Sequence, residues 1–165
     1  FVALVPRLAL GQTPQERRGH GYAYFAPGVT SPGGVGTAHI GGGGEGFFTR
    51  NLGLGVDFGY LTAMQSFADG IGTFSPNFVA RFQPKSGDGK VEPFVTGGYT
   101  LFFRSGVANG FNFGAGMNYW FKERLGYRFE VRDNVMMADG DTGHFVGFRI
   151  GAGMRQATSC SRTVA

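Results

Sequence analysis

From residue 19 onward the chain alternates large apolar residues with small or polar ones, in segments of about ten residues. Segment 51–62 is the clearest. One of its faces carries Leu52, Leu54, Val56, Phe58 and Tyr60, and the other carries Gly53, Gly55, Asp57 and Gly59. A period of two residues is that of a β-strand with two unlike faces. The same reasoning predicts eight strands, at 19–27, 37–48, 51–62, 72–82, 91–103, 110–120, 125–132 and 144–154.

The composition excludes several other classes of protein. The 165 residues include 31 glycines without a three-residue repeat, so the chain is not collagen-like. Aromatic residues make up 15 % of the chain, which argues against a disordered glycine-rich linker. No apolar run approaches the roughly 18 residues that a membrane-spanning helix needs. We therefore expect an all-β fold, an eight-stranded antiparallel up-and-down barrel.

The charged residues of the small-polar face decide between a soluble barrel and a transmembrane barrel. In a lipocalin-like soluble barrel the apolar face points inward, whereas in a transmembrane barrel it points to lipid. The small-polar face carries no lysine and balances four acids against four arginines. These are Glu45, Asp57, Arg81, Glu92, Arg128, Glu130, Arg132 and Arg149. Such a neutral set among glycines is typical of a packed interior, because an unpaired buried charge costs several kcal/mol. We predict that these side chains form a network that plugs the barrel.

A transmembrane barrel also accounts for the aromatic residues and the glycines. Strands of about ten residues, tilted by about 45°, are long enough to cross the hydrocarbon layer. Aromatic girdles belong near the strand ends, where the sequence places Tyr60, Tyr99, Phe103, Tyr119 and Phe121. An eight-stranded barrel is just wide enough inside for side chains to fill. Inward glycines would therefore make room for the arginines and for Phe94, Phe102 and Trp120.

The connections differ in length and in charge. Residues 49–51 and 122–124 are expected to form tight turns and 83–90 a polar turn. The segments 28–36, 62–71, 104–109 and 133–143 are expected to form longer loops at the other rim, where partner specificity would lie. Basic residues, Arg155 among them, gather at the turn rim, and acids such as Asp133 gather at the loop rim. The net charge of +4 therefore reflects one rim and not a nucleic-acid patch.

Two stretches carry a resemblance to a known family. The first runs from Tyr119-Trp120-Phe121 through Tyr127-Arg128-Phe129-Glu130 to Asp133, and the second is Glu92-Pro93-Phe94-Val95-Thr96-Gly97-Gly98-Tyr99. They resemble the penultimate hairpin and a mid-barrel strand of small bacterial outer-membrane β-barrel proteins, the OmpA-like and OmpX-like, porin-like group. The resemblance covers residues 19–155. It implies a Gram-negative outer-membrane barrel that is exported through a signal peptide and inserted by the barrel-assembly machinery.

The two ends of the chain are expected to lie outside the barrel. Residues 1–18 are either the remnant of a secretory signal peptide or an apolar N-terminal tail. Residues 156–165 form a polar C-terminal tail with Cys160, the single cysteine, so no internal disulfide exists. Chains of the resembling group usually end on an aromatic residue of the last strand, whereas here the tail follows Arg155.

No motif in the sequence predicts an enzyme, a cofactor or a metal. The glycine run 41–46 lacks the Lys-Ser/Thr of a phosphate loop and lies inside a predicted strand. No serine stands in a recognisable motif beside His20, His39 or His144, as a hydrolase would require. Asp139-Gly140-Asp141 has too little of a cation-loop signature and is interpreted as a solvated turn.

The sequence thus predicts a monomeric, non-enzymatic protein of the bacterial outer membrane, with a structural or surface-interaction role and without a cofactor. Outer-membrane lipid would surround it, and the sequence does not identify what its loops bind. Three alternatives remain open. They are a narrow pore for small solutes, an enzyme that modifies lipids, and a soluble lipocalin-like carrier.

Overall fold

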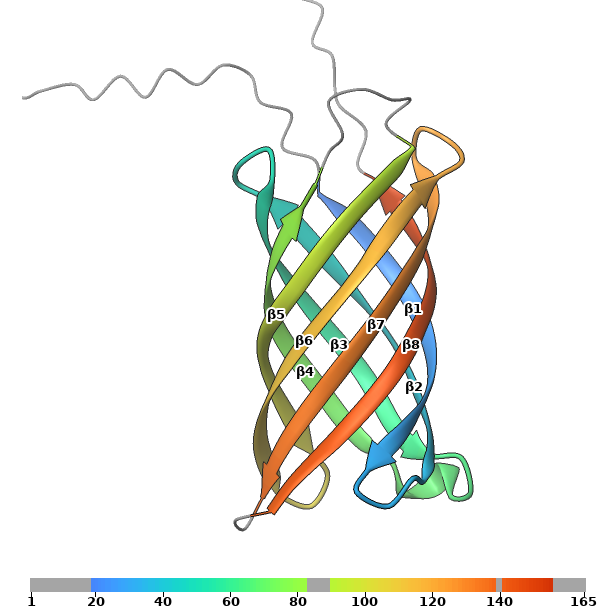
Figure 1. Ribbon diagram of the computed structural model, residues 1–165, viewed down its shortest axis with the longest axis vertical. Coiled ribbons are helices and arrows are strands. Elements are labelled where there is room, and N and C mark those ends of the chain that lie inside the picture. The colour runs from blue at the N-terminus through green and yellow to red at the C-terminus, as the bar shows by residue number, and fades with distance from the viewer. Residues whose placement is uncertain (1–18, 83–89, 139–140, 156–165) are drawn as a thin grey trace, which may run out of the picture.

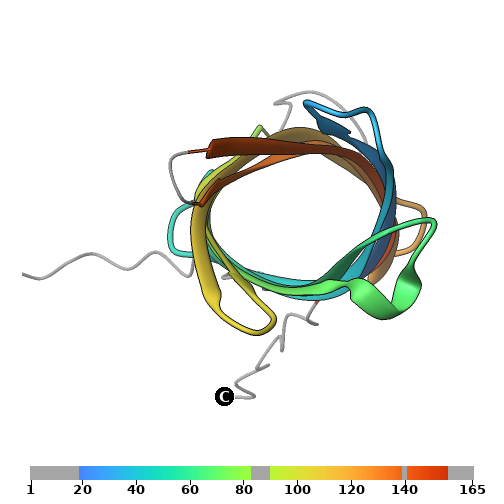
Figure 2. The ribbon, with the colours of Figure 1, turned by 90° about the horizontal axis from the view of Figure 1, so that it is seen from below.

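The computed structural model of the protein describes residues 19–82, 90–138 and 141–155. Eight strands form one closed barrel in sequence order, and each pairs antiparallel with its neighbours (Figures 1 and 2). They are β1 (His20–Ser31), β2 (Gly36–Phe47), β3 (Leu52–Ala63), β4 (Ile71–Arg81), β5 (Val91–Phe103), β6 (Val107–Trp120), β7 (Leu125–Ala138) and β8 (Asp141–Arg155). The 3-10 helix η1 (Phe67–Asp69) lies between β3 and β4. The expected fold class, an eight-stranded antiparallel barrel, is confirmed.

The barrel closes through the pairing of its first and last strands. The β1–β8 ladder runs from His20 opposite Arg155 to Ser31 opposite His144. Every strand therefore has a neighbour on both sides, and the sheet has no free edge. This closure is what allows a sheet to cross lipid, where unpaired backbone N–H and C=O groups are too costly. Within the described residues no helix is long and apolar enough to span a membrane.

The two ends of the barrel are defined by their connections. The turn end contains residues 48–51 and 121–124, together with the start of β1 and the end of β8, and the loop end contains residues 32–35, 64–70 and 104–106 (Figure 1). The prediction of long loops at 28–36, 104–109 and 133–143 is wrong, because β1, β6, β7 and β8 extend into these segments. The alternation fades there, since small or apolar residues such as Ala26, Ala108 and Met136 occupy inward positions.

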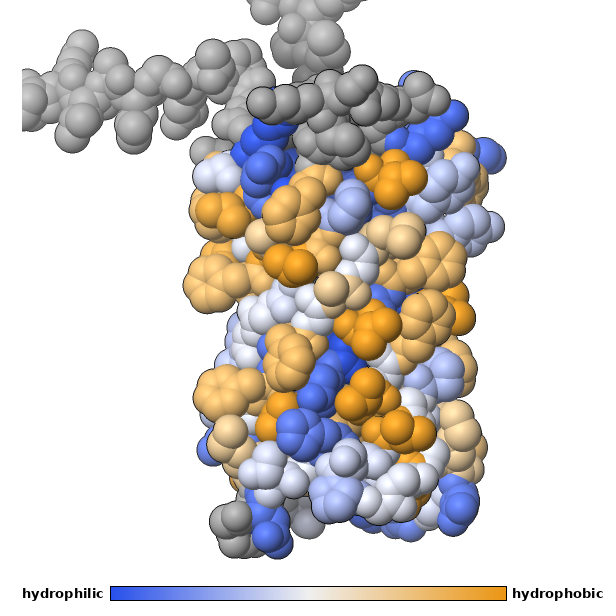
Figure 3. All heavy atoms as spheres, viewed as in Figure 1, coloured by the Kyte–Doolittle hydropathy of each residue, from blue (hydrophilic) through white to orange (hydrophobic). Residues whose placement is uncertain are grey.

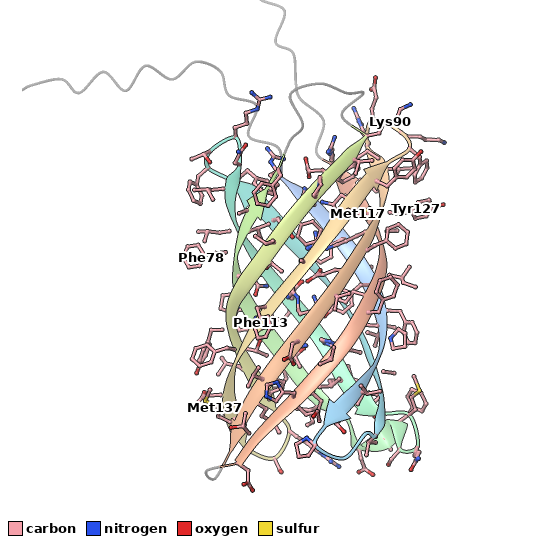
Figure 4. The ribbon with its side chains drawn as sticks, in the orientation of Figure 1. Phe78, Lys90, Phe113, Met117, Tyr127 and Met137 are labelled. Atoms are coloured by element: carbon pink, nitrogen blue, oxygen red, sulfur yellow. The ribbon has the colours of Figure 1, made fainter. Side chains whose placement is uncertain are left out.

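The outer face of the barrel is apolar along its flank. Large hydrophobic side chains gather between more hydrophilic ends (Figure 3), and Phe78 and Tyr127 project away from the barrel wall (Figure 4). Exposed outward residues include Leu54, Phe58, Phe78, Phe111, Phe113, Val131, Phe148 and Ile150. A water-soluble protein rarely exposes so large a contiguous apolar surface. The apolar face therefore points outward, as the sequence predicts for a transmembrane barrel.

Some expectations fall outside the described residues. The suggested signal remnant 1–18, most of the polar turn 83–90, Asp139 and the tail 156–165 with Cys160 belong to this group. The facing of the first strand, which the sequence left unassigned, is settled by the structure. His20, Tyr22, Tyr24 and Ala26 are buried inside the barrel, and the residues between them point outward.

Candidate functional site

The barrel interior brings together the charged residues that the sequence placed on one face. All eight are buried, and they come from β2, β3, β4, β5, β7 and β8. They divide into two groups of contacts. The central network contains Glu45, Asp57, Arg128, Glu130, Arg132 and Arg149, and the turn-end cluster contains Arg81, Glu92 and Arg155.

The central network is a continuous chain of charges across the lumen. Asp57 accepts a hydrogen bond of 2.6 Å from Arg132 Nη1, and its carboxylate lies 3.5 Å from Arg149 Nη1. Glu130 lies between Arg132 and Arg128, and it accepts hydrogen bonds from the Nε atom of each. Arg128 then reaches Glu45 at 2.8 Å. Three carboxylates face three guanidinium groups, so the central network is electrically neutral, as a desolvated interior requires.

Three further side chains contact the carboxylates of the central network. The Tyr22 hydroxyl donates to Asp57 Oδ1 at 2.6 Å, and the Asn77 amide donates to Asp57 Oδ2 at 2.8 Å. His20 Nε2 lies 3.0 Å from Glu45. Two of these three residues come from β1, whose pattern gave no facing, so the sequence reasoning missed them.

The turn-end cluster contains a residue that the sequence reasoning assigned to the outer rim. Glu92 lies 3.4 Å from Arg81 Nη1 and 3.1 Å from Arg155 Nη2, and Asn118 donates to its other oxygen at 3.3 Å. Arg155 is therefore an interior residue, which corrects the prediction. The alternation of β8 could have predicted this position, since every second residue from Arg149 through Gly151 and Gly153 points inward and Arg155 is the next in that series.

The interior arginines stack on aromatic rings as well as pairing with carboxylates. The Arg128 guanidinium lies between the rings of Tyr22 and Phe94, at 4.2 and 3.9 Å from their centroids. The remaining stacked pairs are Arg149 with Tyr24, Arg81 with Phe47, and Arg155 with Trp120, all within 4.1 Å. Cation–π contact strengthens when both partners are desolvated. The carboxylates contact the nitrogen atoms of the guanidinium groups, and the aromatic rings pack against their flat faces. Together these contacts restrict the movement of the arginine side chains.

Glycines make the space that this packing needs. A Cβ atom at Gly43 would lie 2.5 Å from Asp57 Oδ1 and 3.0 Å from the Tyr22 hydroxyl oxygen. A Cβ atom at Gly116 would lie 2.8 Å from the Phe94 ring. The glycine run 41–46 is thus part of β2, and its inward members border the central network.

The three histidines lie in separate places. His20 and His39 are inside the barrel, where His39 Nε2 lies 3.2 Å from the Tyr24 hydroxyl and 3.0 Å from Thr73 Oγ1. His144 points outward and its Nδ1 atom lies 2.8 Å from Asp133 Oδ2. Asp133 belongs to β7 and not to a loop, which corrects its predicted position. Within the described ranges, His, Cys, Asp and Glu form no group of three or more that could hold a metal ion.

A pocket of about 430 Å³ opens at the loop end. Its lining includes Ile71, Phe102, Arg104, Ala108 and Met136. Arg104 Nη2 lies 2.5 Å from Asp69 Oδ1, and this pair joins the β5–β6 connection to η1. The hydroxyl of Ser66 and the guanidinium of Arg104 lower the pKa of the exposed Asp69 carboxyl.

Comparison with known proteins gives structural matches alone. No protein-family model and no curated protein matches the sequence. The N-terminal β-barrel domain of Pseudomonas aeruginosa OprF superposes with a TM-score of 0.66 and 15 % identity, over 85 % of this chain and 98 % of that one. The chain folds as a small outer-membrane β-barrel.

Two further solved structures of outer-membrane barrels match. Neisserial surface protein A superposes with a TM-score of 0.61 and 14 % identity, over 84 % of this chain and 94 % of that one. The outer membrane enzyme PagL superposes with a TM-score of 0.57 and 20 % identity, over 79 % and 97 %. At these identities the likeness extends to the fold, and the same fold serves both an enzyme and a surface protein.

Proposed function

We propose that this outer-membrane barrel is a closed, non-enzymatic scaffold in the bacterial outer membrane, with a lumen that its own side chains plug. The observation that carries the proposal is the neutral central network, which joins β2, β3, β7 and β8 across the lumen. Each of its charges has an opposite partner within contact distance. Opening a path for solute would separate these pairs and leave buried charges uncompensated, at a cost of several kcal/mol.

The free space beside the central network supports the same proposal. The void lined by Ala26, His39, Arg132, Asn134 and Arg149 has a volume of about 10 Å³. A single water molecule needs at least roughly 10–15 Å³. This void therefore has no room for a solute larger than water unless side chains move.

The loop end is the part of a scaffold that is open to partners. The pocket beside Arg104 and the η1 segment that Asp69 anchors form a surface shaped by several connections. We propose that this surface binds a partner outside the membrane while the protein remains a monomer surrounded by outer-membrane lipid. We also propose that the protein is exported through a signal peptide and inserted into the membrane by the barrel-assembly machinery.

Recordings of ion conductance in planar bilayers test the closed lumen. The wild-type protein is expected to give no steady conductance. The double variant Asp57→Ala/Arg132→Ala removes one charge of each sign and is expected to conduct, whereas the outward variant Phe78→Ala is expected to stay closed. Steady conductance of the wild-type protein would establish the narrow pore instead.

One observation favours a second candidate function, lipid modification. Asp133 and His144 form an outward-facing pair, and Ser31 lies directly opposite His144 in the β1–β8 ladder. An ionisable pair on the lipid-facing side is costly and therefore a functional candidate. Acid, imidazole and hydroxyl are the residue types of a hydrolase triad. Release of fatty acid from outer-membrane lipid, lost in both Ser31→Ala and His144→Ala, would establish this function.

A further inference from the structure

The outer face carries a groove near the turn end, over β3, β4 and β5. Its volume is about 470 Å³. Its walls are the exposed side chains of Phe48, Leu52, Phe78 and Val95, and Phe78 is 70 % exposed. Phe78 projects from the barrel wall in Figure 4, as a side wall of such a groove must.

The strand register explains why this part of the flank is hollow. Ala80 on β4 lies between Leu52 on β3 and Val95 on β5. In the β4–β5 ladder, Phe78 pairs with Gly97, two residues along from the pair of Ala80 and Val95. The two small residues are thus diagonal neighbours, and together they form an oblique floor between larger side chains. An apolar hollow of this shape fits a flexible hydrocarbon chain.

The turn at this end of the groove carries a basic residue. Arg50 is exposed and belongs to the turn that joins two wall residues, Phe48 and Leu52. Thr49 Oγ1 accepts a hydrogen bond of 2.8 Å from Leu52 N, and the Arg50 carbonyl accepts one of 2.8 Å from Arg81 Nε. The turn is therefore held both by its own side chain and by an interior arginine.

The wider rim has the same sign of charge. Lys90, Lys122 and Arg124 are exposed at the turn end, as Arg50 is. Glu123, also exposed there, carries the opposite charge. Basic residues at the membrane surface attract anionic lipids. The apolar groove and the basic turn thus match the two parts of one molecule, an acyl chain and an anionic headgroup.

We propose that this groove binds a phospholipid with an anionic headgroup, with one acyl chain on the floor of Ala80 and Gly97 and the phosphate beside Arg50. The site is independent of the central network and of the loop end. It holds one defined lipid while the rest of the flank exchanges lipid freely.

Native mass spectrometry of the detergent-released protein tests the proposal. The protein is first reconstituted in bilayers of equal parts phosphatidylglycerol and phosphatidylcholine. The wild-type protein is expected to retain one phosphatidylglycerol. Gly97→Leu fills the floor and is expected to lose this lipid, and its backbone tolerates a Cβ, since the nearest atom to it is Asn112 O at 3.7 Å.

Two comparisons separate groove binding from general effects. Gly44→Leu makes the same change at another outward glycine, where a Cβ would have its nearest atom at 3.6 Å, and it is expected to retain the lipid. Arg50→Gln is expected to lower the preference for phosphatidylglycerol over phosphatidylcholine about fivefold. Ala80→Leu fills the same floor and replaces Gly97→Leu if that variant fails to show the heat-modifiable gel mobility of a folded barrel.

Three outcomes would overturn the proposal. In the first, the wild-type protein retains no lipid. In the second, Gly97→Leu and Gly44→Leu retain the lipid equally, so the lipid is not in the groove. In the third, a dimer is lost in Gly97→Leu, which would make the groove a contact between two copies of the chain. None of these outcomes bears on the conductance of the lumen, so the closed scaffold is tested separately.

Discussion

Asp57 on β3 accepts a 2.6 Å hydrogen bond from Arg132 on β7, a strand four positions away in the closed order of eight. The pair therefore ties opposite walls of the barrel together. Asp57 also accepts hydrogen bonds from the Tyr22 hydroxyl and the Asn77 amide and contacts Arg149, so five strands meet at its carboxylate: β1, β3, β4, β7 and β8. We expect the central network to stabilise the closed shape in addition to blocking the lumen.

Asp57→Asn should destabilise the barrel. The substitution keeps the size of the side chain, but it removes the carboxylate that Arg149 pairs with and one of the two carboxylates that Arg132 pairs with. Removing one partner of a buried ion pair costs about 3–5 kcal/mol. Urea unfolding in lipid vesicles, followed by tryptophan fluorescence of Trp120, would measure the change in the free energy of unfolding.

The double variant Asp57→Asn/Arg132→Met is the control for this prediction. It removes one charge of each sign, so the remaining network is again neutral. It should lose less stability than Asp57→Asn alone, because two carboxylates and two guanidinium groups remain and the lumen holds no excess positive charge. A double variant at least as unstable as the single one would show that charge balance is not what the network supplies.

Gly43→Ala should destabilise the barrel and Gly44→Ala should not. A Cβ atom at Gly43 would meet Asp57 Oδ1 and Val56 O at 2.5 Å, whereas one at Gly44 would have His20 O as its nearest atom, at 3.6 Å. Overpacking of this kind costs about 1–3 kcal/mol, and an outward change stays within about 0.5 kcal/mol. Equal unfolding midpoints for the two variants would contradict the close packing around Asp57.

Arg128→Lys should be destabilising although it keeps the charge. Lysine loses the planar stack between Tyr22 and Phe94 and cannot reach Glu45 and Glu130 with one rigid fork. We expect a loss of about 1–3 kcal/mol. Arg124→Lys, an exposed change at the turn end, serves as the matched control and should leave the unfolding curve unchanged.

The loop end should loosen in acid. Because Ser66 and Arg104 lower the pKa of the Asp69 carboxyl, its ionised form favours the folded loop. That contribution is present above the ordinary carboxylate range, about pH 4, and is lost as the pH falls through the lowered pKa of Asp69. The protection of residues 64–70 against hydrogen exchange, measured relative to the intrinsic exchange rate at each pH, should fall in acid. Arg104→Gln should exchange faster already at neutral pH and show a smaller change in acid.

Fractionation of cells should recover the protein with the outer membrane and release it only in detergent. The folded barrel should migrate differently on gels before and after heating, because its closed sheet resists detergent without heat. Recovery in the aqueous fraction, with no change in gel mobility, would contradict a transmembrane barrel and favour a soluble carrier.

The alternation of apolar and small residues was sufficient to predict the number of strands, their order and the inward direction of Asp57, Arg128 and Arg149. It failed where the inward side chains are themselves apolar or small, as in β1 and at the loop ends of β6 and β7. Period-two reasoning depends on a contrast between two faces. Where the inward residues are small or apolar, as at Ala108 and Met136, that contrast disappears.

Sequence alone determined that the chain has two unlike faces, because the direction of a strand side chain depends on local backbone geometry. It also determined that the polar face is rich in glycine and carries both arginines and carboxylates. Only the tertiary structure decided which charges meet, such as Asp57 and Arg132 across 75 residues of chain. Such contacts depend on the register and closure of all eight strands. Closure likewise brought the rings of Tyr22 and Phe94 against Arg128, placed Arg155 inside, and left a groove on the outer face over β3, β4 and β5.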